Sequence, residues 1–88
     1  MKPMPEPIHI EVYSRPGCHL CDQVRAVIEE LRGAYAITLR SINVENDAEI
    51  EKKYGMDIPV VFVNGVEAFR HRVDRSELER KLKSLWNK

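Results

Sequence analysis

The sequence predicts an α/β domain in which a four-stranded mixed sheet is formed by elements in the order β-α-β-α-β-β-α. Three observations predict this class: alternating apolar residues near the N-terminus, an apolar run before the turn dipeptide Asn64-Gly65, and helical apolar spacing elsewhere. The 88 residues suffice for one hydrophobic core. We therefore expect a single domain over residues 8–88, after a short disordered lead-in at residues 1–7.

The first part of the chain predicts a strand, a turn and a helix. Apolar and polar residues alternate over 8–12, which is the period of a strand, and Pro16-Gly17 predicts a turn. Apolar residues then recur at helical spacing over 20–31, and Gly33 stands where a helix commonly ends.

A second strand and a short helix are predicted next. Apolar residues alternate over 37–44, and the alternation skips one step at residues 40–41, which predicts an irregularity in this strand. Asn46 or Asp47 is suited to cap a short helix, and Gly55 is suited to end it.

The last third predicts a hairpin and a final helix. The continuous apolar and β-branched run at 60–63 precedes Asn64-Gly65, the preferred chemistry of a tight turn, so residues 66–73 are predicted to return as a strand. Asp74 and Glu77 form a variant of the capping box, which predicts a helix beginning there. Right-handed crossovers make the first two strands parallel, and we expect the helices to cover both faces of the sheet.

The charges of the chain balance, with 14 Lys and Arg residues against 14 Asp and Glu residues. A net charge of zero supplies no field for phosphate backbones, so we expect no nucleic-acid partner. No apolar stretch is long enough for a membrane helix, and no secretory signal is visible, so we expect no membrane partner and a cytoplasmic location.

The two cysteines stand three residues apart, at the predicted start of the first helix. Helix N-termini and Cys-x-x-Cys motifs lower the pKa of a cysteine from about 8.5 to between about 3.5 and 7.5. We therefore interpret Cys18 as the nucleophile of thiol-disulfide exchange and Cys21 as the resolving thiol. Arg15 and His19 are candidates to stabilise the thiolate, and the alternative for each is a solvated surface residue.

Two alternatives for the cysteines remain open: half of a zinc site, and incidental buried thiols. Zinc normally takes four protein ligands, and the remaining candidates, His9, His19 and His71, stand at no recognised spacing. We expect no metal site.

Ile58 and Pro59 precede the buried hairpin strand. Proline is tolerated at the first position of a strand, and this role alone would explain it. If Pro59 is cis, the N–H and C=O groups of Ile58 become free to pair with an extended substrate beside Cys18.

Two segments carry a family resemblance: YSRPGCHLC at residues 13–21 and IPVVFVNG at residues 58–65. With the element order, they resemble the glutaredoxin-like branch of the thioredoxin superfamily over residues 8–86. The resemblance implies a thioredoxin fold with strand order 2-1-3-4, a nucleophilic Cys18, a resolving Cys21 and a cis Pro59. Thiol-disulfide exchange is the implied activity.

This chain departs from the glutaredoxin pattern in segments that hold glutathione in that family. Glutaredoxins typically carry Pro-Tyr between the cysteines and a Gly-Gly-x-Asp turn before the last helix, whereas this chain has His-Leu and the segment FRHRVD at residues 69–74. Arg15 matches the family's basic residue before the nucleophile, and Asp74 is a candidate for the turn aspartate. Arg70 and Arg72 are candidates to bind a glutathione carboxylate, or charges that blunt an exposed edge strand.

We expect a monomeric oxidoreductase without a tightly bound cofactor, which acts on disulfide-containing proteins or glutathione mixed disulfides. Glutathione or a reductase of the thioredoxin-reductase type is the expected electron donor. Two alternatives are an iron-sulfur cluster carrier and a non-catalytic binding module. Retention of Cys21 and loss of the glycine pair weigh against the cluster carrier.

Overall fold

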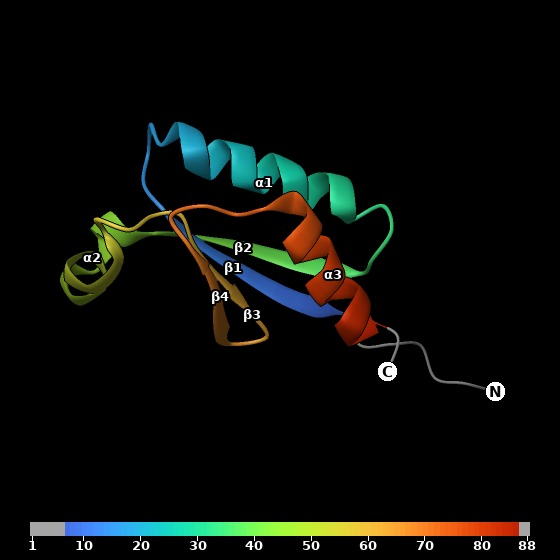
Figure 1. The fold of residues 1–88 in the computed structure, drawn as a ribbon. Coiled ribbons are helices and arrows are strands. Elements are labelled where there is room, and N and C mark those ends of the chain that lie inside the picture. The colour runs from blue at the N-terminus through green and yellow to red at the C-terminus, as the bar shows by residue number, and fades with distance from the viewer. Residues whose placement is uncertain (1–6, 87–88) are drawn as a thin grey trace.

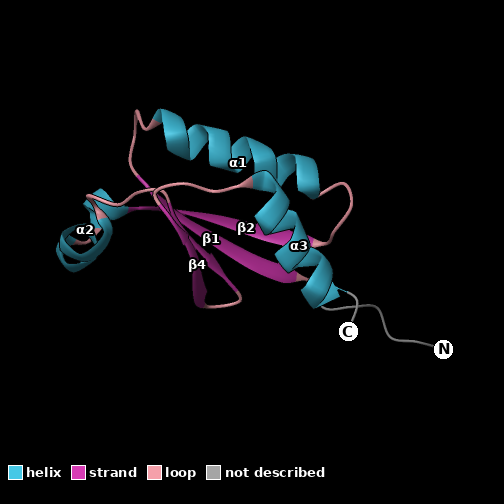
Figure 2. Ribbon diagram, in the orientation of Figure 1, coloured by secondary structure: helices cyan, strands magenta, loops and turns pink. Residues whose placement is uncertain are grey.

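The computed structural model describes residues 7–86 as one α/β domain (Figure 1). Residues 1–6 of the predicted lead-in lie outside the described range. Figure 2 shows the distribution of helices, strands and loops. The elements, in chain order, are β1 (Ile8–Ser14), α1 (His19–Leu31), β2 (Ile37–Asn43), the 3₁₀ turn η1 (Val44–Asn46), α2 (Ala48–Tyr54), β3 (Val60–Val63), β4 (Val66–Arg70) and α3 (Arg75–Trp86).

The four strands form one mixed sheet in the order β2-β1-β3-β4. β1 pairs parallel with β2, and β3 pairs antiparallel with both β1 and β4. This order and the predicted sequence of elements are confirmed. Asn64 and Gly65 both have positive φ, as a tight hairpin turn requires.

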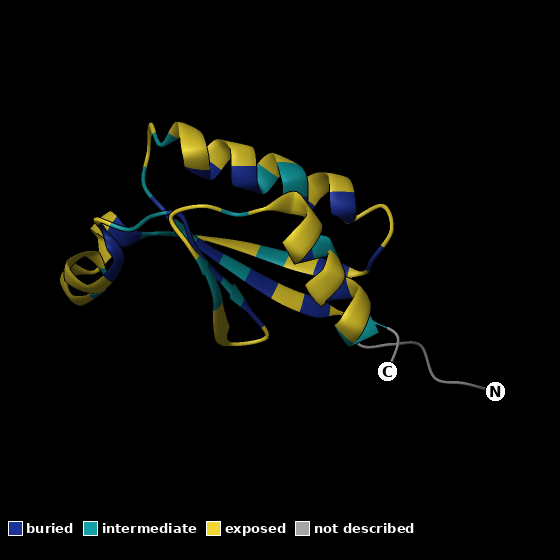
Figure 3. Ribbon diagram, in the orientation of Figure 1, coloured by how far each residue is buried: buried dark blue, intermediate teal, exposed yellow. Residues whose placement is uncertain are grey.

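The hydrophobic core lies on one face of the sheet, between the strands and two helices (Figure 3). Alternation along β1 directs Ile8, Ile10 and Val12 to this face, where they are buried. Both α1 and α3 cover the same face, and their core residues are Val24, Ile28, Leu31, Leu78 and Leu82. Within residues 7–86, only the short α2 is left to cover the opposite face, so the predicted cover of both faces is incomplete on that side.

The opposite face is covered at one end by the short helix α2 (Figure 1). Tyr54 of α2 packs against Tyr13 and Phe62, with ring centroids 4.9 and 5.8 Å apart. Asp47 caps α2, because its carboxylate accepts hydrogen bonds from two N–H groups of the first turn. Farther along this face, His9 and other side chains remain exposed.

Two strand predictions need correction. β2 pairs with β1 without interruption, so the skipped step at residues 40–41 reflects two exposed positions and no bulge. The register shift lies instead between β3 and β4, at Val61 and Phe62. β4 also ends at Arg70, because His71 has a φ of 72° that no strand residue adopts.

No helix within residues 7–86 has the length and apolar character needed to cross a membrane.

Candidate active site

Cys18 and Cys21 lie at the N-terminus of α1 and are joined in a disulfide, with their Cα atoms 5.2 Å apart. Cys18 caps the helix in an extended conformation and is half-buried, whereas Cys21 is fully buried. The main-chain N–H of Cys21 donates a hydrogen bond to Sγ of Cys18 at 3.1 Å. The sulfur of Cys18 is therefore accessible to a partner molecule, whereas the sulfur of Cys21 contacts Cys18 inside the fold.

The turn before the disulfide depends on a glycine. Gly17 has a φ of 82°, which L-residues with a side chain rarely adopt. The turn is closed by a hydrogen bond from the N–H of Cys18 to the carbonyl of Arg15 at 3.3 Å. This geometry directs Cys18 from the end of β1 to the first turn of α1.

Arg15 joins this turn to the C-terminal end of α2. Its guanidinium donates to the carbonyl oxygen of Gly55 at 3.0 Å and lies 3.8 and 3.6 Å from the carboxylates of Glu45 and Glu51. A Cβ atom at Gly55 would lie 2.5 Å from the carbonyl oxygen of Glu51 and 2.8 Å from the guanidinium, so a side chain there would displace the backbone or Arg15. A role of Arg15 in substrate binding stays a prediction.

The cis peptide bond between Ile58 and Pro59 lies at the same end of the sheet. Tyr13 pairs with Val60, so the end of β1 that leads to the cysteines runs beside the start of β3. His71 binds this turn twice: its N–H donates to the carbonyl of Pro59 at 2.8 Å, and its Nδ1 lies 3.3 Å from the carbonyl oxygen of Ile58. The carbonyl of Ile58, which the sequence predicts to be free, therefore lies beside an imidazole nitrogen.

Arg70 anchors the same turn from the edge strand. Its guanidinium donates to the carboxylates of Asp57 and Glu67 and lies 5.3 Å above the ring of Tyr54. The hydrogen bonds from Arg70 lower the pKa of Glu67, and those to Glu67 and Asp57 raise the pKa of Arg70. Its positive charge is therefore already paired.

Arg25 attaches the first turns of α1 to the sheet. Its guanidinium donates to the hydroxyls of Ser14 and Ser41 at 3.2 and 3.1 Å and pairs with Asp22. Ser14 is almost fully buried, so this bond satisfies a polar group inside the fold. The helix end that carries the disulfide is thus linked to β1 and β2.

The remaining predicted residues lie around this centre. His19 is exposed at the first position of α1. The carboxylate of Asp74 accepts a hydrogen bond from the N–H of Glu77 at 3.1 Å, so the predicted cap of α3 is confirmed. Arg72 lies beyond the edge strand, in the loop before α3. Among residues 7–86, no three His, Cys, Asp or Glu side chains are arranged to hold a metal ion.

Sequence reasoning missed the residues that connect the loops. The sequence indicates Gly55 only as a helix end, and His71 only as a candidate zinc ligand. The contact between Arg15 and Gly55 joins positions 40 residues apart, and no spacing pattern indicates it.

Comparison with known proteins identifies the family. Residues 9–83 match the family described as the glutaredoxin-like domain (DUF836). The chain belongs to this glutaredoxin-like family. Among curated proteins, the chain is 30% identical over 84 residues to "Glutaredoxin-like protein YDR286C homolog" of Dictyostelium discoideum, covering 89% of this chain and 78% of the other.

Solved structures place this glutaredoxin-like domain in the thioredoxin fold. Protein Ne2328 of Nitrosomonas europaea superposes with a TM-score of 0.81 and 27% identity, covering 93% of this chain and 99% of the other. A mutant thioredoxin of Halobacterium salinarum superposes with a TM-score of 0.65 and 19% identity, covering 92% and 76%. The domain therefore combines a glutaredoxin-like thioredoxin fold with a Cys18–Cys21 pair at disulfide distance.

Proposed function

We propose that this domain is a thiol-disulfide oxidoreductase that reduces protein disulfides, or mixed disulfides with glutathione, through Cys18 and Cys21. The observation that carries the proposal is the pairing of a half-exposed Cys18 at a helix N-terminus with a fully buried Cys21. An incoming disulfide reaches the exposed sulfur, and the buried sulfur reacts only with Cys18. This asymmetry is what a nucleophile and a resolving thiol need.

The first step is attack of the Cys18 thiolate on one sulfur of the substrate disulfide. A bond forms between Sγ of Cys18 and that sulfur, the substrate S–S bond breaks, and the leaving thiolate takes a proton from water. Unpaired N–H groups and the helix dipole at the start of α1 stabilise the thiolate. The N–H of Cys21 also points at this sulfur, at 3.1 Å in the oxidised state.

The second step releases the substrate. Cys21 loses its proton, and its sulfur attacks Sγ of Cys18. The mixed disulfide then breaks, and the second substrate thiolate leaves and is protonated. The substrate gains two electrons, and the protein is left with the Cys18–Cys21 disulfide. Two electrons from a thiol donor return it to the dithiol form.

The donor is either glutathione or a reductase of the thioredoxin-reductase type. Glutathione would need cationic groups for its carboxylates. Arg15 and Arg70 already face carboxylates of this chain, whereas Arg72 pairs with no carboxylate within residues 7–86. Asp74, His19 and Ile58 remain proposed contacts of the substrate. A reducing compartment such as the cytoplasm suits this cycle, because cysteine pairs there are usually catalytic.

Insulin reduction tests the proposal. We expect turnover with one of two donor systems, thioredoxin reductase with NADPH or glutathione with its reductase, and the active system identifies the donor. Cys18→Ser should abolish turnover, and Cys21→Ser should accumulate a mixed disulfide visible by intact mass. Ser84→Ala, on α3 away from the cysteines, is the control. Full activity in Cys18→Ser would refute the mechanism.

A further inference from the structure

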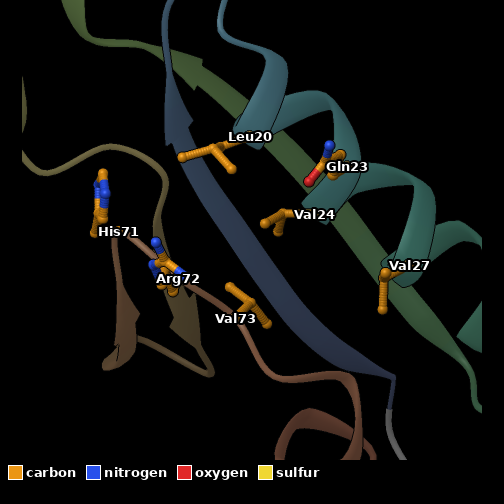
Figure 4. A pocket seen from close by; sticks show the side chains of 7 residues that line it. All are labelled: Leu20, Gln23, Val24, Val27, His71, Arg72 and Val73. Carbon is orange, nitrogen blue, oxygen red and sulfur yellow. The ribbon is translucent and has the colours of Figure 1, made fainter.

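A groove runs along α1 from Leu20, which stands between the two cysteines in the sequence, to Val27 (Figure 4). Leu20, Val24 and Val27 form one wall, and the segment after β4, with Arg72 and Val73, forms the other. The hollow measures about 310 Å³. This is near the lower end of the range of ~300–1,000 Å³ found for small-molecule sites, so its size suits one or two side chains.

The groove has an aliphatic side chain open to solvent at the end nearest the cysteines. Leu20 stands between Cys18 and Cys21 in the sequence and is 41% exposed, although its spacing predicts a core position. Figure 4 shows Leu20 and Val24 pointing from α1 toward the opposite wall. Leu20 is not isolated, because Val24 and Val27 continue its apolar surface along the groove, and a contiguous apolar surface favours contact with a partner.

The opposite wall is attached to the Ile58–Pro59 turn. His71, the first residue of this wall, donates its main-chain N–H to the carbonyl of Pro59, and its Nδ1 lies 3.3 Å from the carbonyl oxygen of Ile58. An extended segment that approaches Cys18 along this turn therefore continues into the groove. Main-chain pairing with the N–H of Ile58 gives affinity, and a side-chain pocket beside it gives specificity.

One wall of the groove carries a positive charge. Arg72 is exposed and forms no ion pair with another residue in the range 7–86, whereas Arg15 and Arg70 each face two carboxylates. Gln23 on the facing wall is neutral, and the carboxylate of Asp74 is used to cap α3. Aliphatic walls with an unpaired guanidinium are complementary to an aliphatic side chain followed by a carboxylate.

We propose that this groove selects protein substrates in which an aliphatic residue and an acidic residue follow the target cysteine. The aliphatic side chain enters between Leu20, Val24 and Val73, and the carboxylate pairs with Arg72. This inference rests on the proposed disulfide reduction and names the substrate class of that same site.

Four short peptides test the groove. Each carries one cysteine as a mixed disulfide with thionitrobenzoate, followed by Leu-Glu, Leu-Lys, Ser-Glu or Ser-Lys. Attack by the reduced protein on the peptide sulfur releases the coloured thiolate, whose appearance gives the second-order rate constant. We expect the Leu-Glu peptide to react fastest. Replacing its Glu by Lys should slow the reaction about fivefold, as expected for one partly exposed ion pair.

Arg72→Glu should reverse the charge preference, so that the Leu-Lys peptide reacts faster than the Leu-Glu peptide. Arg80→Glu is the matched control, because Arg80 is an exposed arginine of α3 and its substitution changes the net charge equally. Leu20→Ser should reduce the advantage of Leu over Ser, because Leu20 is 41% exposed and lines the proposed site, with circular dichroism confirming that the variant is folded.

The outcomes separate this inference from the proposed function. Equal rate constants for all four peptides, or an unchanged charge preference in Arg72→Glu, would overturn the proposed selectivity of the groove and leave the proposed disulfide reduction intact. Reaction of every peptide no faster than with Cys18→Ser would overturn the proposed function, and the groove with it.

Discussion

Removal of the Arg15 side chain tests how the disulfide turn is held against α2. Arg15 donates to the carbonyl of Gly55 at 3.0 Å and lies 3.8 and 3.6 Å from the carboxylates of Glu45 and Glu51. A hydrogen bond with a charged donor contributes about 1.5–3 kcal/mol. The side chain is 34% exposed, so the lower part of this range applies. The two longer ion pairs add under about 1 kcal/mol together.

We therefore expect Arg15→Ala to lower the free energy of unfolding by about 2 kcal/mol. Each kcal/mol shifts the Tm of a domain of this size by about 4–8 °C, so the Tm should fall by roughly 8–16 °C. Thermal unfolding of the oxidised protein, followed by circular dichroism, measures this loss.

Arg32→Ala is the matched control for this measurement. Arg32 pairs with Glu29 on the exposed surface of α1, and such a pair contributes about 0.5 kcal/mol or less. A fall in Tm for Arg15→Ala no larger than that of the control would refute the reasoning.

Gly55→Ala examines the same contact from the other side. Gly55 has helical angles, with φ of −57° and ψ of −31°, and alanine at such a position normally stabilises a protein by about 0.4–1 kcal/mol. Here a Cβ atom would lie 2.5 Å from the carbonyl oxygen of Glu51 and 2.8 Å from the guanidinium of Arg15. We expect this crowding to reverse the sign, so that the variant melts below the wild type. A gain in Tm would contradict the close approach.

Two further predictions concern α3 and the edge of the sheet. Asp74→Ala should cost about 1 kcal/mol in urea denaturation, because the cap of α3 is lost, whereas Asp74→Asn keeps an acceptor and should cost much less. Hydrogen bonds from Arg70 lower the pKa of Glu67 below 4.5, so this interaction stabilises the fold above pH 4.5 and is lost as the pH falls through the folded-state pKa. The free energies of unfolding of wild type and Glu67→Gln should therefore differ at pH 7 and converge toward pH 3. A difference that does not change with pH would count against the Arg70–Glu67 interaction.

The central strands could be predicted from local patterns because their environment is simple. β1 alternates since one face is buried, and β3 is a continuous apolar run next to it. The end of β4 could not be predicted, because His71 adopts a positive φ that histidine seldom adopts and no residue pattern indicates. The side on which α3 packs was also open, since helix length does not determine which face a helix covers.

The redox pair could be predicted because both cysteines lie on one short motif. The groups that position this motif could not, because they come from distant loops. His71 reaches Ile58 across 13 residues and Arg15 reaches Gly55 across 40. Such contacts depend on the packing of β1 beside β3, which brings the two turns to the same end of the sheet.

The position of Arg15 favours a role in holding the disulfide turn over the predicted role in stabilising the thiolate. A guanidinium that faces two carboxylates contributes little net positive potential to a nearby sulfur, because the opposite charges largely cancel. The N–H groups of the first turn of α1 are then the main positive groups at Cys18. Substitution of Arg15 should therefore disturb the placement of the turn more than the stability of the thiolate, which is why the melting temperature, and not the thiol titration, is the decisive measurement for this residue.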